Sequence, residues 1–275
     1  MTLRECIAEA EKRGIAIGHF NISDSEGFKA VVEGARELGV PVIIGVSEGE
    51  REFIGLQEIV SLVNVARGNG LSVYINADHT YSVEKARKAI DAGVDSVIID
   101  EADKTFEDNI SITKDIVQYS GGRVLVEGEL GFIGKSSKVL DRVPDGVTQT
   151  TPKDAKRFVE ETGIDLLAPA VGNVHGIVTT GEPKLNIELI RAIRDAVKIP
   201  LVLHGASGNS DEEIIAAIDA GIRIVHINTE LRLAYKEGLK EAVQSGEIAP
   251  YKFMEAAVEN MKEVVKKKLK LFNKI

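Results

Sequence analysis

Short runs of apolar residues alternate with longer amphipathic stretches along nearly the whole chain. Eight of these runs are rich in Val, Ile and Leu, which is typical of parallel strands buried on both faces. They span Ala16–Ile22, Pro41–Val46, Leu71–Asp78, Ser96–Asp100, Arg123–Leu130, Asp165–Val171, Pro200–His204 and Arg223–Asn228. The alternation therefore predicts eight buried strands separated by helices and loops.

Most of the segments between these runs have helical spacing. Glu26–Gly39 and Val83–Gly93 carry apolar residues on one helical face and end in glycine, a common C-terminal stop. Thr151–Gly163 begins with Thr-Pro-Lys-Asp, and Pro152 suits a first helical turn. A strand–helix unit repeated eight times predicts a closed (β/α)8 TIM barrel, with a doubly wound open sheet as the alternative.

No composition shift marks a linker, so we expect a single domain over residues 1–275. Met254–Phe272 predicts one extra C-terminal helix, and its lysine-rich run Lys266–Lys270 is expected to be a solvated face. The irregular stretches Gly131–Thr150 and Asn173–Lys184 follow the fifth and sixth strands. Barrel enzymes place active-site loops at such positions.

Composition and charge narrow the function classes. A net charge of -9 argues against a non-specific binder of nucleic acid or membrane surfaces. The single cysteine, Cys6, excludes an intrachain disulfide and a cysteine-based zinc cluster. No apolar run approaches the ~20 residues that span a bilayer, and the first residues lack the apolar core of a signal peptide. We expect a cytoplasmic protein.

All five histidines, His19, His79, His175, His204 and His226, lie within or just past a predicted strand. The C-terminal strand ends of a barrel form one rim, so such side chains converge. His79, His175 and His204 lie at strand exits and form the best trio for zinc, with a hydrogen-bonded core histidine as the alternative for each. Three such ligands leave a tetrahedral position open, as in catalytic zinc sites that polarise a carbonyl. For His19 and His226 we expect packing or ligand contact.

Asp78 directly precedes His79. Side chains alternate along a regular strand, so both cannot face inward. We therefore expect Asp78 to be the last regular strand position and His79 to lie in the turn. An acid beside a metal ligand can serve as a proton donor, or it can be a helix cap or a hydrogen-bond partner of a ligand.

The fifth strand carries two glutamates on its inward face. Period two places Leu125, Glu127 and Glu129 together, and the apolar alternates should face the helices. An unpaired carboxylate inside a barrel is unfavourable, so these groups should meet a cation or a base. Asp100 ends the neighbouring strand and could share a second cation with Glu129. A buried ion pair with lysine is the alternative.

Two loops near the end of the chain suit a phosphate. His204–Glu213 runs from the seventh strand into a helix, and its glycines and Ser207 let backbone N–H groups turn toward an anion. His226–Glu230 leads from the eighth strand into another helix, and these two loops often bind phosphate in barrels. Part of the pattern, Ser210–Glu213, is explained by a helix capping box alone.

Several stretches of the chain also match the sequence motifs of a known protein family. They are Gly18–Gly27, Val42–Glu50, Asn76–Asp100, Phe106–Lys114, Val126–Gly131, Pro169–Gly176, Val202–Gly208 and Ile227–Leu239. In these stretches the chain resembles the class II, metal-dependent fructose-bisphosphate and tagatose-bisphosphate aldolases. The resemblance implies reversible cleavage of a ketose 1,6-bisphosphate, fructose 1,6-bisphosphate first, to dihydroxyacetone phosphate and glyceraldehyde 3-phosphate. It also implies a homodimer or homotetramer.

The resemblance implies roles for the residues at matching positions. It makes Asp78 the proton donor in condensation, and in cleavage the same group takes up the C4 hydroxyl proton. Zinc acts as the Lewis acid, so no lysine Schiff base is required. It gives the catalytic zinc to His79, His175 and His204, a second divalent cation to Asp100 and Glu129, a monovalent cation to Val174, Gly176, Gly205 and Ser207, and substrate and phosphate contacts to Gly176, Gly205, Ala206, Ser207, Asn228 and Thr229.

The chain departs from the family in its substrate region. The family has a loop with Gly-Gly and an acidic pair where this chain has Phe132–Lys138. The family's loop glutamate, which exchanges a carbon-bound proton, is therefore replaced near Ser136 or Ser137. Glu129 or Asp141 could supply another base, or the reaction could differ.

Two further departures lie nearby. His226 replaces an asparagine that contacts substrate, and Glu101–Asp103 replaces a Gly-Ser-His type motif. These leave open a tagatose-bisphosphate or other ketose-1-phosphate aldolase. A metal-dependent sugar-phosphate isomerase or hydrolase and a non-catalytic phosphometabolite binder also stay open.

Overall fold

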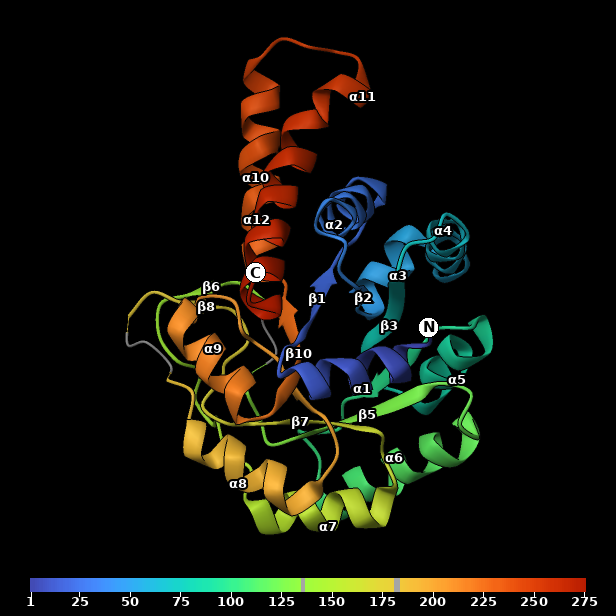
Figure 1. Cartoon of the computed structure of the whole chain (residues 1–275), viewed down its shortest axis with the longest axis vertical. Helices are drawn as coiled ribbons and strands as arrows, with labels where there is room; N and C mark the ends of the chain where they lie inside the picture. Colours follow the sequence, from blue (N-terminus) through green and yellow to red (C-terminus); the bar gives the residue numbers. More distant parts are fainter. Residues whose placement is uncertain (135–136, 181–183) are drawn as a thin grey trace.

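The computed structural model describes residues 1–134, 137–180 and 184–275 and confirms the TIM barrel (Figure 1). Eight parallel strands close in the order β1-β10-β9-β7-β5-β4-β3-β2. They are β1 (Ile17–Asn21), β2 (Val42–Val46), β3 (Val73–Thr80), β4 (Ser96–Ile99), β5 (Leu125–Leu130), β7 (Leu166–Pro169), β9 (Leu201–Leu203) and β10 (Ile222–Ile227). Because β1 pairs with both β2 and β10, the open-sheet alternative is wrong.

Helices surround the barrel and follow the predicted pattern. They are α1 (Leu3–Arg13), α2 (Ser25–Leu38), α3 (Glu48–Ile54), α4 (Leu56–Gly68), α5 (Val83–Ala92), α6 (Phe106–Ser120), α7 (Pro152–Thr162), α8 (Ile187–Val197), α9 (Asp211–Ala220), α10 (Thr229–Gln244), α11 (Pro250–Phe253) and α12 (Glu255–Asn273). Gly39, Gly93 and Gly163 end their helices in the left-handed conformation, as their positions predict.

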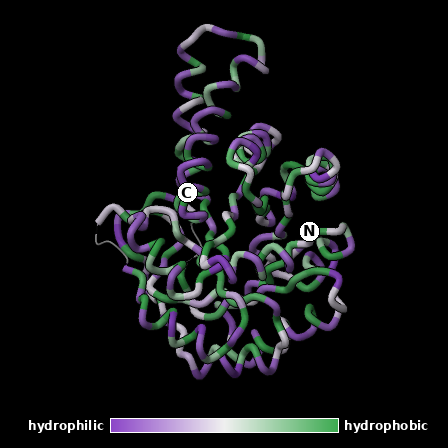
Figure 2. Tube along the Cα trace, viewed as in Figure 1, coloured by the Kyte–Doolittle hydropathy of each residue, from purple (hydrophilic) through white to green (hydrophobic). Residues whose placement is uncertain are grey.

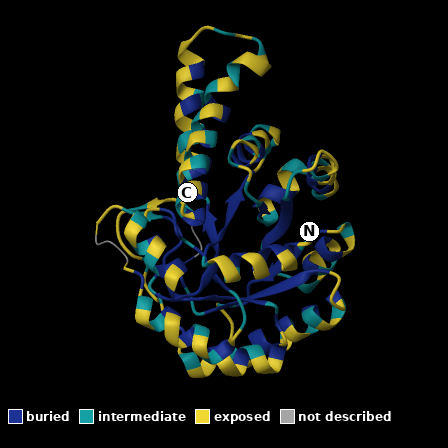
Figure 3. Ribbon diagram, viewed as in Figure 1, coloured by how far each residue is buried: buried dark blue, intermediate teal, exposed yellow. Residues whose placement is uncertain are grey.

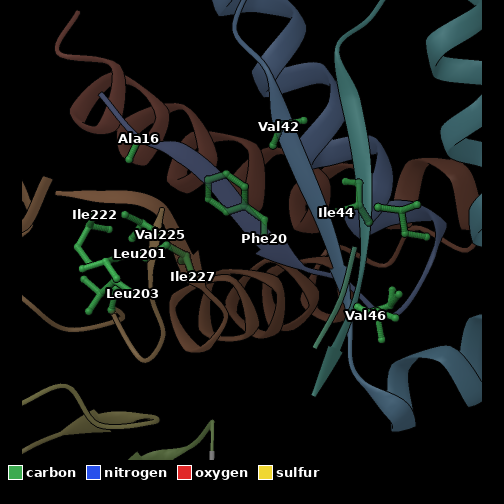
Figure 4. Packing of buried hydrophobic residues seen from close by; sticks show 14 of the residues in the cluster. Ala16, Phe20, Val42, Ile44, Val46, Leu201, Leu203, Ile222, Val225 and Ile227 are labelled. Carbon is green, nitrogen blue, oxygen red and sulfur yellow. The ribbon is translucent and has the colours of Figure 1, made fainter. Parts of the chain in front are cut away.

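Two apolar clusters hold the barrel. The outer cluster combines strand residues such as Phe20, Val42, Ile44 and Val225 with apolar residues of the surrounding helices (Figure 4). The helices alternate hydrophilic and hydrophobic residues and expose one side, whereas the strands of the barrel are buried (Figures 2 and 3). The inner cluster lies at the N-terminal end of the strands, where α1 closes the barrel with residues such as Ile7. The C-terminal end of the barrel is therefore the end at which a functional site can form.

The two irregular stretches meet in a small sheet that the sequence does not predict. Two-residue strands β6 (Val139–Leu140) and β8 (Ile177–Val178) pair in parallel. Strands this short carry no periodicity to detect. Their pairing joins the loops that follow β5 and β7 at the C-terminal end of the barrel.

The predicted C-terminal helix is present as α12, which packs along α10 and α2 and ends beside β1 (Figure 1). The expectation that the lysine run is solvated is wrong for Lys268, which is only 3% exposed and lies 2.9 Å from Glu230. Its position on the helix faces the neighbouring elements and not solvent. Among the described residues, no helix is long and apolar enough to cross a membrane.

Candidate metal centre

A bulge in β3 sets the positions of Asp78 and His79. The pairing with β4 shifts by one residue between Ala77 and Thr80, and His79 has a positive φ of 38°. β3 continues to Thr80, so the expectation that the strand ends at Asp78 is wrong. The extra residue breaks the alternation, and both Asp78 and His79 reach the barrel interior. A non-glycine residue in this conformation is strained, as is common at functional sites.

The structure brings His79, His175 and His204 together. His79 comes from β3, His175 from the loop after β7, and His204 from the residue after β9. Their ring centroids are 4.8 Å apart for His79–His175, 5.0 Å for His79–His204 and 5.9 Å for His175–His204. One possible ligand atom from each, and one from Glu129, all lie within 4.8 Å of one another. Three imidazoles at this spacing can hold one divalent ion.

Neighbouring acceptors fix the orientation of two of these rings. Nδ1 of His79 donates to Asp100 at 2.8 Å, and Nδ1 of His175 donates to the carbonyl oxygen of Gly134 at 2.6 Å. Each ring keeps Nε2 for another partner. Metal-bound histidines typically donate their second nitrogen to a carboxylate or carbonyl in this way.

His204 follows the same arrangement with its nitrogens exchanged. Its Nε2 donates to Glu127 at 2.8 Å. Its Nδ1 faces Oε2 of Glu129 at 3.2 Å, yet neither atom makes a well-formed hydrogen bond with any described residue. Two buried polar atoms left in this way are unfavourable unless a cation or proton lies between them. The donor set therefore fits a divalent ion.

The charges around the rings push their pKa values apart. Burial disfavours charge on His79, but Asp78, Asp100 and Glu129 outweigh it and raise the pKa of His79 to about 9. Burial also opposes the charge on His204, but Glu127 and Glu129 raise its pKa well above the ordinary value. Burial and the two neighbouring imidazoles lower the pKa of His175 to about 3. A metal ion would take the place of the protons on the first two rings.

Asp78 presents one carboxylate oxygen to the centre of the site. Its Oδ2 accepts from Nδ2 of Asn21 at 2.8 Å, and Asn21 also donates to Glu50 at 3.0 Å. Its Oδ1 lies 3.9 Å from Nε2 of His79 and 3.6 Å from Nδ1 of His226, with no hydrogen bond among the described residues. Burial raises the pKa of Asp78, but the surrounding histidines outweigh it and lower it. The carboxylate is therefore ionised.

His19 and His226 form a stack beside the trio. Their rings are parallel to within 1° at 3.4 Å, and His226 lies 4.1 Å from the ring of His204. Gly45 makes room, because a Cβ there would lie 2.0 Å from Cε1 of His19. Burial lowers the pKa of both rings, that of His19 to about 4. Possible ligand atoms of His19, Asp78 and His226 also lie within 4.8 Å of one another. Imidazole nitrogens bind metals in the ring plane, however, and two parallel rings stacked at 3.4 Å are poorly placed to share one ion, so the trio is the better candidate.

The inner cavity beside the trio, about 30 Å³, is lined by most of the residues predicted to contact substrate. These are Gly176, Gly205, Ser207, His226, Asn228 and Thr229, together with Ser137. Ala206 is the exception, because its side chain belongs to the outer apolar cluster. Ser136 lies outside the described residues. Asp141 is exposed beside β6 and, like Glu129, lines neither this cavity nor the next.

Two arginines near the site are not predicted from the sequence, and one of them lines an adjoining outer cavity of about 190 Å³. Arg232 lines it with half of its side chain exposed and donates to Glu50 at 2.9 Å. Arg51 donates to the backbone oxygen of Asp78 at 2.9 Å and so supports the bulge. Helical spacing could have found Arg232, since it lies one turn after Asn228 on α10.

A closed parallel barrel with a histidine cluster at its C-terminal rim defines a TIM-barrel protein with a candidate metal centre. Residues 1–275 match the family described as fructose-bisphosphate aldolase class-II. The fructose-bisphosphate aldolase of Staphylococcus epidermidis is 38% identical over 279 residues, which cover 99% of this chain and 96% of that protein. That of Geobacillus stearothermophilus is 40% identical over 248 residues, covering 88% and 85%.

A solved structure of an aldolase is also similar to this chain. The crystal structure of the YdjI aldolase from Escherichia coli K12 has a TM-score of 0.86 and 35% identity, with 98% of this chain and 96% of that chain covered. The chain therefore belongs to the class II fructose-bisphosphate aldolase family, and the resemblance found in its sequence is confirmed.

Proposed function

We propose that the protein is a zinc-dependent aldolase that reversibly cleaves a ketose 1,6-bisphosphate, with fructose 1,6-bisphosphate as the favoured substrate. The products are dihydroxyacetone phosphate and glyceraldehyde 3-phosphate. One observation supports this above the others: His79, His175 and His204 each donate one ring N–H to a fixed acceptor, and one possible ligand atom from each lies within 4.8 Å of the others. A bound zinc ion would draw electron density from the ketose carbonyl.

Asp78 moves the proton in this mechanism. Its Oδ1 is turned to the centre of the site, and Asn21 holds its other oxygen. In cleavage Oδ1 accepts the C4 hydroxyl proton while the C3–C4 bond breaks, and the electron pair of that bond stays on the three-carbon fragment, which takes up a proton at C3 to become dihydroxyacetone phosphate. In condensation C3 loses that proton and attacks the aldehyde carbon, and Oδ1 returns its proton to the aldehyde oxygen. The buried position excludes bulk water from this transfer, since Asp78 is 2% exposed.

The inner cavity supplies the phosphate and substrate contacts. Backbone N–H groups around Gly176, Gly205 and Ser207, with the start of α10 at Asn228 and Thr229, form an anion site. Nε2 of His226 is buried and has no hydrogen-bond partner among the described residues, and His226 lines the same cavity, so we assign this ring a contact with the sugar. Oxygens of Val174, Gly176, Gly205 and Ser207 are the proposed ligands of a monovalent cation.

Glu129 and Asp100 are proposed to hold a second cation. They flank Nδ1 of His79 at 3.8 Å and 2.8 Å respectively. Burial and the nearby charge of Asp100 raise the pKa of Glu129, and a cation between the two carboxylates would offset both effects. Because Glu129 lines neither cavity, the cation role is favoured over exchange of a carbon-bound proton.

The proposal also covers the localisation, the binding partners and the oligomeric state of the enzyme. A single buried free cysteine, Cys6, and a net charge of -9 support a cytoplasmic protein that binds neither nucleic acid nor membranes. We also propose a homodimer or homotetramer, which light scattering on the eluted protein would measure.

A substrate panel tests the function. Purified protein is analysed for metal content and assayed with fructose and tagatose 1,6-bisphosphates by a coupled triose phosphate assay. We expect zinc-dependent release of triose phosphate that EDTA abolishes and added zinc restores. Metal-loaded protein that releases no triose phosphate from any ketose phosphate contradicts the proposal and favours an isomerase, a hydrolase or a binder.

A further inference from the structure

An ion pair between a buried lysine and a partly exposed glutamate connects the last helix to α10 and, through that glutamate, to the loop after β9. Lys268 of α12 is 3% exposed, and its Nζ lies 2.9 Å from Oε1 of Glu230 in the first turn of α10. The same oxygen accepts the backbone N–H of Gly208 at 3.1 Å. A lysine is almost never buried this deeply unless its charge is paired.

Glu230 holds the loop after β9 at Gly208, while neighbouring residues of the same loop line the inner cavity. Gly205 and Ser207 line the inner cavity, and Ser207 accepts the backbone N–H of Asn228 at 3.3 Å. The loop is thus tied to α10 by two hydrogen bonds, one at Ser207 and one at Gly208. The N–H of Gly208 points to Glu230, so the phosphate site depends on the geometry that Glu230 imposes on its neighbours.

The position of Glu230 raises an electrostatic conflict. An acidic residue in the first helical turn stabilises the helix through the partial positive charge of its N-terminus. The same charge repels an anion bound at that N-terminus. Among the described residues, Lys268 is the one lysine or arginine that pairs with Glu230.

We propose that Lys268 is a positioning residue of the phosphate site. It neutralises Glu230, so that this carboxylate can hold the loop at Gly208 without repelling a phosphate bound at Gly205, Ser207 and the start of α10. The inference rests on the phosphate site of the proposed function. It makes α12 part of the substrate-binding machinery.

The test measures binding of inorganic phosphate to the metal-loaded full chain by calorimetry, together with kcat and KM. Lys268→Met should weaken phosphate binding and raise KM about tenfold, because the charge of Glu230 is no longer compensated at short range. The value of kcat should stay within about twofold, since no reacting atom is touched. The double variant Lys268→Met/Glu230→Gln should recover most of the affinity, because the amide oxygen still accepts from Gly208 without charge.

Two controls make the result specific. Lys267→Met removes a neighbouring lysine whose side chain is 68% exposed and lies 3.7 Å from Asp211, and it should change nothing. If Lys268→Met fails to fold, Glu230→Gln alone should bind phosphate more tightly, because the lysine charge is then uncompensated.

The outcomes separate the inference from the proposed function. Folded Lys268→Met with unchanged phosphate affinity, or a double variant no better than the single one, overturns the inference. If Glu230→Gln must serve as the test, unchanged or weaker binding overturns it. If the wild type and the variants bind phosphate in the expected order but the wild type cleaves no ketose phosphate, the inference is upheld and the aldolase assignment is overturned.

Discussion

The two ends of the barrel are built from the same strands but from opposite chemistries. At the N-terminal end the inward residues are apolar, and α1 closes over them; they include Ile17, Tyr74, Leu125, Val202 and Ile224. Two residues further along the same faces stand His19, Asn76, Glu127, His204 and His226. All ten side chains are buried. One end therefore stabilises the fold by apolar burial, and the other buries polar groups that a ligand must satisfy.

The largest effect should come from removing a ligand at the polar end. His204→Ala deletes one of three imidazoles and leaves Glu127 and Glu129 without their partner. We expect cleavage of fructose 1,6-bisphosphate to fall by about a thousandfold or more, with zinc content reduced. Far-UV circular dichroism should still show a folded barrel. Full activity in zinc-replete buffer would contradict the ligand assignment.

A matched pair on β5 sharpens the comparison. Leu125→Ala, at the apolar end, should destabilise the protein by about 2–5 kcal/mol and leave kcat/KM nearly unchanged. Glu127→Ala, two residues further along the same face, should weaken zinc binding about 10- to 100-fold, because Nε2 of His204 loses its acceptor. Denaturant unfolding and chelator competition measure the two quantities. If both variants lost stability alike and neither lost zinc affinity, the division between the two ends would be wrong.

Metal affinity should rise with pH. Without metal, His79 with a pKa of about 9 and His204 with a raised pKa carry protons at neutral pH, whereas His175, with a pKa of about 3, does not. A divalent ion binds neutral imidazole, so binding releases protons and the zinc affinity increases up to about tenfold per pH unit for each proton released. Chelator competition between pH 6 and pH 9 follows this. A flat profile would show that these rings are already neutral.

The smallest effect concerns the stacked imidazoles. Gly45→Ala places a methyl group against the ring of His19 and should displace it without touching the trio. We expect KM to rise a few-fold, about 0.5–1.5 kcal/mol, through the shift of His226, with zinc content unchanged. Gly68→Ala, where a Cβ would meet nothing, is the matched control. Equal KM values in both variants would show that the stack does not shape the site.

Periodicity and strand ends were enough to predict the barrel and to select His79, His175 and His204. Period two also placed Glu127 and Glu129 inside the barrel. The bulge at Asp78 could not be predicted as such, because it depends on one extra residue paired against β4. The roles of Arg232 and Lys268 depend on partners far away in the sequence, Glu50 and Glu230, which only the closed barrel brings near.

The most direct test is a crystal structure of the zinc-loaded protein. The account predicts one zinc ion at about 2.0–2.1 Å from Nε2 of His79, Nε2 of His175 and Nδ1 of His204. Zinc bound instead to His19, Asp78 and His226, or absent from this rim in fully active protein, would contradict it.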